Sequence, residues 1–393
     1  MNNIVTPGAQ QLANPGVGGT ARDGFLDSWR GIFQIVMLLD HMTFVYPGTF
    51  ALLSVVYCFF GYVSVAEGFV FLSGFVSGLV YTRVGREKGN RAVWRKAIVR
   101  VRDFYLCYVL AVIALLALAK AIGRPPLEPD WQTDLAVLSL PVASAKVAAL
   151  LYQPTILEIL PMYCLFLLAT PLILKRLEKG NYAEVALVSL SLWIGAQYGI
   201  RDVLLRLWPH RIETHFGYFN SCAWQILFVF GLICGHKTYT SKTHWLPAGW
   251  KLPAMAYICF VVLFAMRHNL IGINVHYRLV DRALMGPLRL FDFACIAYLV
   301  CSARGWMERL IGWRGFAFLS RHSLQVFAFH VFPLYLVAVL MGNRTSVPVW
   351  AQLLAVVFCI MSLFQIALLA KLFTSASLRF FGKRQVGSAL PAR

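Results

Sequence analysis

Charged residues are scarce in this chain of 393 residues, and acidic residues are the scarcest of them. Asp, Glu, Lys and Arg together make up 13% of the sequence, whereas hydrophobic residues make up 59%. An average soluble domain is about one-quarter charged, and the mean hydropathy of +0.66 is strongly apolar. Because a soluble fold of this length cannot bury so much apolar surface, the composition predicts an integral membrane protein.

The sequence also lacks the features of a nucleic-acid-binding or metal-binding protein. Its formal net charge is +19, but the basic residues lie between apolar runs rather than along one polar surface. None of the nine cysteines forms a Cys-x-x-Cys pair, and each lies in or beside an apolar segment. We therefore expect no nucleic-acid partner and no metal site.

The N-terminal residues lack both the basic and the apolar region of a signal peptide. We expect a flexible cytoplasmic tail at residues 1–21, an integral-membrane domain at 22–376 and a basic cytoplasmic tail at 377–393. Residues 135–150 have an interrupted helical pattern, which favours a helix at the membrane surface. About ten apolar runs are long enough to cross a bilayer and predict an all-α, polytopic membrane helix bundle: 27–47, 61–82, 103–122, 151–174, 182–199, 222–236, 252–266, 283–303, 323–341 and 348–374.

Basic residues are concentrated in alternate connectors, and this asymmetry predicts the orientation of the bundle. Many Lys and Arg side chains lie between residues 83 and 102, which places this connector in the cytoplasm. Counting the runs from there places both chain termini in the cytoplasm as well. The sequence shows no internal repeat, so an architecture of duplicated halves has no support.

The first apolar run carries ionisable side chains where a membrane-spanning helix normally has none. Those that share one helix face with Gln34 are Asp27, Arg30 and His41, because the eleven residues from Arg30 to His41 complete about three turns. An ionised group at mid-bilayer costs about 3 kcal/mol, so such groups usually face a protein interior or a water-filled cavity. This polar stripe is therefore the leading candidate for an active site.

A histidine near neutral pKa can act as a general base toward a hydroxyl group. A carboxylate that orients the other ring nitrogen would assist His41, and we expect Asp27 or a carboxylate from another helix, because Asp40 points about 100° away. Arg30 suits a phosphate or another anionic group. In the structural alternative, an Arg–Asp pair locks two helices and His41 is a core hydrogen-bond donor.

Six sequence blocks, taken in order, resemble a known family. The blocks are RDGFLDSWRGIFQIVMLLDHM, EGFVFLSGF, ILEILPMYCLFLLATPLIL, FNSCAWQILFVFGLICG, MGPLRLFDF and FLSRHSLQVFAFH. They resemble the OpgC family of the integral-membrane acyltransferases, in which an arginine precedes a histidine on the first span, as Arg30 precedes His41. The likeness covers most of residues 22–335. One departure is Ser320, where relatives usually have glycine.

The resemblance implies a membrane O-acyltransferase that moves an acyl group, expected to be succinyl, from cytoplasmic acyl-CoA to hydroxyls of a periplasmic glucan. It implies a multi-pass protein of the bacterial inner membrane in which His41 is the catalytic base, assisted by Asp27 and Arg30. No bound cofactor is expected, because acyl-CoA is a co-substrate. The basic run at 83–102 suits the CoA phosphates, although topology and anionic lipid contact explain it equally well. The other residues that we expect to bind substrate are Glu67, Glu158, Asn220, Arg289, Arg321 and His330.

Several of these residues also have structural explanations. Glu67 suits a helix N-terminus, Arg289 an internal ion pair, and His330 a core hydrogen bond, while Ser73 and Gly74 favour close helix packing over catalysis. A proton-coupled or anion transporter that uses the same charged residues is the alternative function. An acyltransferase for lipid or amine acceptors would differ only in its substrate. The sequence leaves the oligomeric state open.

Overall fold

The structure is a computed structural model, and the residues that it describes are almost all helical. The described ranges are 23–45, 58–123, 138–206, 215–241, 249–342 and 347–387. The tail expected at residues 1–21 lies outside them. The C-terminal helix continues to Gly387, well into the tail expected from residue 377.

Within the described ranges, the helices follow one another with only two short strands between them. They are α2 (Gly24–Val45), α3 (Val65–Lys88), α4 (Asn90–Ile122), α6 (Leu140–Ala148), α7 (Ile159–Glu178), α8 (Tyr182–Gln197), α9 (Ile200–Arg206), α10 (Ser221–Thr240), α11 (Lys251–Arg267), α12 (Tyr277–Val280), α13 (Pro287–Ser302), α14 (Arg304–Ile311), α15 (Arg314–Arg321), α16 (Ser323–Phe329), α17 (Val331–Met341) and α18 (Val349–Gly387). The strands β1 (Tyr152–Gln153) and β2 (His215–Phe216) pair in parallel. The all-α prediction is therefore confirmed.

The number of membrane-crossing helices is smaller than expected. Among the described residues, five stretches are long and apolar enough to cross a bilayer, namely α3, α4, α7, the α16–α17 pair and the apolar part of α18. A sixth is obtained if α13 and α14, which meet at a bend of 82°, are counted as one span. Within the described residues the candidate spans are therefore five or six, fewer than the ten that were predicted.

The remaining apolar runs also form helices, but these helices are too short or too polar to meet the same conditions. α8 and α11 contain 16 and 17 residues, and at 1.5 Å per residue both fall short of the ~30 Å apolar core of a bilayer. α2 is long enough but carries Asp27, Arg30 and Asp40. α10 ends with His236 and Lys237 in its last turn or two. Counting apolar runs overestimated the number of spans, because it took no account of where the helices end or of the charged residues within them.

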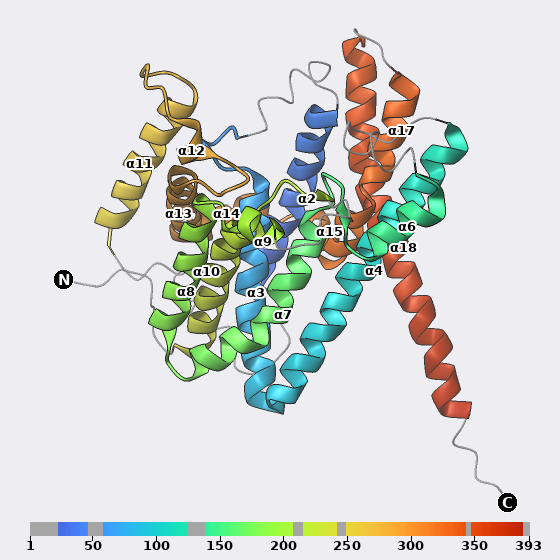
Figure 1. The fold of residues 1–393 in the computed structure, drawn as a ribbon, viewed down its shortest axis with the longest axis horizontal. Helices are drawn as coiled ribbons and strands as arrows, with labels where there is room; N and C mark the ends of the chain where they lie inside the picture. The colour runs from blue at the N-terminus through green and yellow to red at the C-terminus, as the bar shows by residue number, and fades with distance from the viewer. Residues whose placement is uncertain are drawn as a thin grey trace, which may run out of the picture.

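The packing of α3 against α10 in the centre of the bundle depends on glycine (Figure 1). A Cβ added to Gly74 would lie 2.1 Å from the carbonyl oxygen of Phe228, and one added to Gly235 would lie 2.0 Å from that of Phe75. The two backbones therefore approach as closely as glycine permits. The expectation that Gly74 serves close packing is confirmed.

A similar contact brings α15 against α2. A Cβ added to Gly31 would lie 2.1 Å from the carbonyl oxygen of Phe316 on α15. The chain then continues through α16, breaks its helix at His330 and resumes as α17, so that all three short helices contact α2. This arrangement places residues 320–330 along the polar stripe of α2.

Candidate functional site

The polar stripe of α2 faces the end of α15 and the start of α16. The hydroxyl of Ser320 donates to Asp27 Oδ1 at 2.8 Å. Arg30 Nη2 donates to Ser323 Oγ at 2.9 Å, and Gln34 Nε2 donates to the Ser323 carbonyl at 3.1 Å. The glycine contact that brings α15 close to α2 thus lets these short side chains meet.

Further along α2, His41 meets His330 at the break between α16 and α17. His41 Nδ1 lies 2.7 Å from His330 Nε2, and the two rings stack with centroids 4.9 Å apart and planes inclined by 27°. His330 is fully buried, and its Nδ1 lies 2.5 Å from the carbonyl oxygen of Phe327. His41 remains partly exposed. The pair therefore consists of one incompletely buried histidine supported by a second, fully buried one.

Asp27 cannot orient His41, although both residues belong to the same stripe. They are 14 positions apart in the sequence, which is about 21 Å along the helix axis. The shared face was predicted from angular position, but the distance along the axis separates the two side chains. The ring partner of His41 is His330, a residue that the sequence indicated as a substrate contact.

A basic cavity of about 430 Å³ opens beside the stripe, among α2, α3, α4, α7, α15 and α16. Its cations are Arg30, Lys96, Arg100 and Arg321. Lys96 lies over the ring of Tyr81 at 5.9 Å, and Arg100 lies over that of Phe104 at 4.8 Å. Both charges come from the basic run at 83–102. The cavity is therefore suited to an anionic ligand with apolar parts.

The cavity leads toward the histidine pair. Gln34 and Phe327 belong to its lining, and the Phe327 carbonyl is the group that contacts His330. From Gln34 to His41 the helix rises by about 10 Å. A larger groove of about 540 Å³ between α7, α8 and α10 is mostly apolar and contains none of the predicted site residues. The basic cavity is thus the better candidate site.

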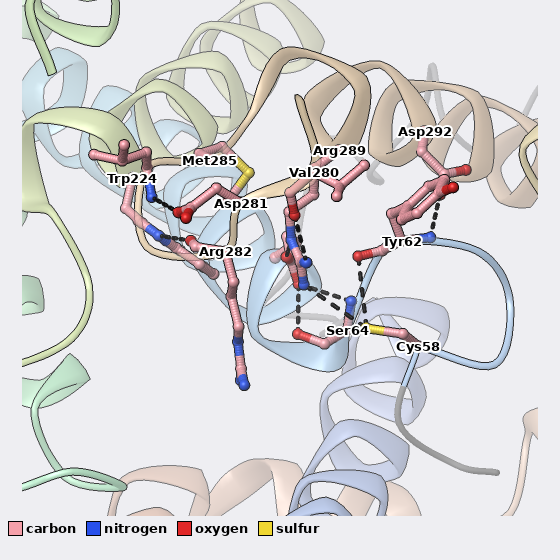
Figure 2. A network of polar contacts seen from close by, with 12 residues as sticks. Cys58, Tyr62, Ser64, Trp224, Val280, Asp281, Arg282, Met285, Arg289 and Asp292 are labelled. Atoms are coloured by element: carbon pink, nitrogen blue, oxygen red, sulfur yellow. Dashed lines mark hydrogen bonds and ion pairs between the residues drawn. The ribbon is translucent and has the colours of Figure 1, made fainter. Parts of the chain in front are cut away.

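Glu67 and Arg289 form a buried ion pair that joins α3 to α13. Figure 2 shows Arg289 on the side that faces Ser64 and Cys58. Glu67 also accepts hydrogen bonds from the backbone and hydroxyl of Ser64, at 2.9 and 2.7 Å. The nearby Asp292 accepts a hydrogen bond from the Tyr62 backbone at 2.7 Å. Glu67 therefore lies at a helix N-terminus and Arg289 lies in an internal ion pair, as the structural explanations require. The ion pair joins these two residues to each other.

Glu158 and Asn220 are held by the backbone near the β1–β2 pair. Glu158 precedes α7, is buried, and accepts a hydrogen bond from the Tyr218 backbone. Asn220 caps α10, because its Oδ1 accepts from the Cys222 N–H at 3.0 Å. Its own N–H donates to the Ala283 carbonyl at 3.1 Å. The side chain of Asn220 is thus engaged in a helix cap.

Arg282 is a residue that the sequence analysis did not select, and the structure gives its loop unusual support. Its carbonyl and the next three accept, in order, from Trp224 Nε1 (2.9 Å), the Asn220 backbone (3.1 Å), Gln197 Nε2 (2.6 Å) and Trp193 Nε1 (2.8 Å). The Arg282 side chain extends away from this loop (Figure 2). It lies within electrostatic range of Asp40, His41 and Glu158. No motif in the neighbouring sequence indicates Arg282, because the groups that donate the four hydrogen bonds belong to α8 and to the start of α10.

Comparison with known proteins gives one match that covers nearly the whole chain. The family described as OpgC protein matches residues 22–375. No curated protein and no solved structure matches the chain. This family indicates an acyltransferase-type, glucan-modifying membrane protein, in agreement with the apolar helices and the six sequence blocks. The chain belongs to the OpgC protein family.

Proposed function

We propose that the chain transfers an acyl group from acyl-CoA to a hydroxyl of a periplasmic glucan, with His41 as the general base. The observation that carries this proposal is the contact of the partly exposed His41 ring with the buried His330, beyond a basic cavity on the same helix. A base of this kind needs one oriented and accessible ring nitrogen. His41, which contacts the ring of His330 and is itself incompletely buried, is the residue that we propose for this role.

The basic cavity suits the phosphates of CoA. Arg100 and Arg321 line the cavity from two different helices, α4 and α15, and guanidinium groups bind phosphate through paired hydrogen bonds. Arg30 lies with Gln34 on the α2 wall, toward His41. A donor anchored by its phosphates would extend its thioester arm along α2 toward the histidine pair.

The chemistry then proceeds in two steps. His41 takes the proton of the acceptor hydroxyl while the oxygen attacks the thioester carbonyl carbon, which forms a tetrahedral intermediate. The intermediate collapses, the carbon–sulfur bond breaks, and the thiolate of CoA leaves and takes the proton back from His41. The products are an ester of the glucan and free CoA, and His41 is regenerated.

We assign Arg282 to the free carboxylate of a succinyl group. Arg289, the alternative cation, is buried in an ion pair with Glu67, whereas the Arg282 guanidinium lies over the ring of Phe219 at 5.2 Å. Arg282 lies in a loop in which four consecutive backbone carbonyls accept hydrogen bonds, and its charge lies within electrostatic range of His41. These bonds fix the Arg282 backbone and the Phe219 ring supports its guanidinium, and a positioned guanidinium loses less entropy when it binds a carboxylate. It therefore supports a dicarboxylic rather than a neutral acyl group.

The test is mass spectrometry of periplasmic glucans from cells that carry the intact gene, no gene, or the His41→Ala variant. The intact gene should add one acyl mass to the glucans, and the other two should add none. His276→Ala is the matched control, because His276 is exposed beside α12 and lies outside the cavity lining. Unchanged glucans with the intact gene would refute the proposal and lead next to lipid acceptors and to transport.

A further inference from the structure

The geometry points to His330 as the positioning residue that fixes the tautomer of His41, so that His41 acts through Nε2 with a neutral imidazole in place of an orienting carboxylate. This inference rests on the proposed acyl transfer. It concerns a pair of residues 289 positions apart in the sequence, and no sequence motif joins them.

The tautomers of His330 and His41 follow from the Phe327 carbonyl, which can accept a hydrogen bond but cannot donate one. The Phe327 carbonyl has no proton to donate, so the facing His330 Nδ1 carries the hydrogen. In a neutral imidazole the other nitrogen is then an acceptor, so His330 Nε2 offers a lone pair. His41 Nδ1, 2.7 Å away, must donate to it. The lone pair of His41 is consequently left on Nε2, where it can accept a proton.

The surroundings of the pair favour a neutral partner. His330 has no exposed surface, and Val326 and Val331 on either side of it are equally buried. A buried carboxylate requires compensating charge or several hydrogen bonds, whereas a neutral imidazole needs one donor and one acceptor. His330 finds both, in His41 and in the Phe327 carbonyl.

The same contact assists His41 after it takes the proton. The imidazolium then carries hydrogens on both nitrogens, and Nδ1–H continues to donate to His330 Nε2 without any rearrangement. A hydrogen bond to a charged donor is stronger than one to a neutral donor. His330 thus holds the ring in one orientation in both protonation states of His41, as the partners of metal-bound histidines do.

The experiment compares His330→Met with His330→Gln in the full-length protein. Methionine fills the space without a comparable acceptor, whereas the glutamine carbonyl oxygen can accept from His41 Nδ1. We expect His330→Met to lower kcat by about 10- to 100-fold with the KM for acyl-CoA unchanged. His330→Gln should recover a large part of that loss. If the two variants have equal thermal midpoints, a difference in kcat between them reflects the positioning of His41 and not a difference in folding.

A second measurement does not depend on turnover. Diethyl pyrocarbonate modifies an unprotonated ring nitrogen, so the rate at which His41 is modified, followed by peptide mass spectrometry, reports its accessible lone pair. We expect slower modification of His41 in His330→Met than in the wild type or in His330→Gln. Equal rates in all three proteins would overturn the tautomer assignment.

The outcomes also separate this inference from the proposed function. If the wild-type protein transfers no acyl group, the proposed function is refuted. Wild-type activity that is lost in His41→Ala but unchanged in His330→Met would refute only the role of His330. A loss of kcat in His330→Met that His330→Gln does not relieve at all would equally count against it, because acceptor chemistry would then be irrelevant.

Discussion

At the scale of single residues, this protein uses polar side chains of similar appearance in different ways. Asn220 caps a helix and Glu67 binds Arg289, so each is engaged by the fold itself. His41 is incompletely buried, and Arg321 is exposed on the wall of the basic cavity. Substrate recognition is therefore to be sought at the second kind of residue.

Arg282 gives the first test at this scale. We expect Arg282→Gln to lower kcat/KM for succinyl-CoA by roughly 10- to 100-fold, because a hydrogen bond to a charged group contributes about 1.5–3 kcal/mol. Transfer from acetyl-CoA, which has no carboxylate, should change little. The measurement is kcat/KM of the purified protein with each donor. The control is Arg278→Gln, because Arg278 is an exposed neighbour. Equal losses with both donors would contradict a role in acyl recognition.

Asn220 gives a test with the opposite expectation. Asn220→Ala removes the cap of α10 and should lower stability by about 1 kcal/mol, seen as a reduced thermal midpoint. The KM for the glucan should remain that of the wild type, since the side-chain oxygen is already bonded to the Cys222 N–H. A higher KM at unchanged stability would instead support the substrate contact expected from the sequence.

At the scale of elements, close helix contacts determine which side chains can reach one another. The Gly31 contact holds α15 against α2, and the α3–α10 contact forms the centre of the bundle. The break at His330 divides one apolar run into α16 and α17 and directs an imidazole toward α2. Short hydrogen bonds such as Arg30 to Ser323 depend on these backbone positions.

Gly235 provides the test of the central contact. A Cβ at this position would lie 2.0 Å from the Phe75 carbonyl oxygen, so Gly235→Ala must force α3 and α10 apart. We expect a destabilisation of about 1–3 kcal/mol, measured as a lower thermal midpoint in detergent. Gly24→Ala is the matched control, because no atom lies within 4 Å of its added Cβ. A wild-type midpoint for Gly235→Ala would contradict the packing described.

At the scale of the whole molecule, the excess of basic over acidic residues contributes to the basic cavity. The formal net charge is +19, and Lys96, Arg100 and Arg321 bring part of it to one opening between helices. Such a field attracts polyanions and raises their rate of association. A phosphorylated donor would therefore be drawn to the same cavity that we propose as its binding site.

Salt dependence tests this field. Arg321→Gln should raise the KM for acyl-CoA several-fold at about 0.01 M salt, where the Debye length is roughly 30 Å, and much less at about 1 M, where it is roughly 3 Å. The control is Arg309→Gln, an exposed charge on α14 outside the cavity lining. A shift in KM that is equal at both salt concentrations would exclude a long-range electrostatic contribution.

The expectations from sequence succeeded where the information is local. Apolar runs predicted helices, and the small residues at 73 and 74 predicted a close contact that Gly74 indeed makes. The span count failed because run length ignores where helices end, as in the 16-residue α8. Asp27 was one of the carboxylates expected to orient His41, because helical phase was considered without distance along the axis. Arg282 was missed because nothing in its neighbouring sequence indicates the support it receives.

The sequence by itself determined that this protein is helical, belongs in a membrane, and carries a polar stripe from Asp27 to His41 on its first helix. These properties depend on composition and on periodicity within one segment, which operate over a few turns. Only the tertiary structure decided that His330 is the partner of His41 and Ser323 the partner of Arg30. Those contacts join residues almost 300 positions apart, and they exist because backbone packing brings α2, α15 and α16 within hydrogen-bonding distance.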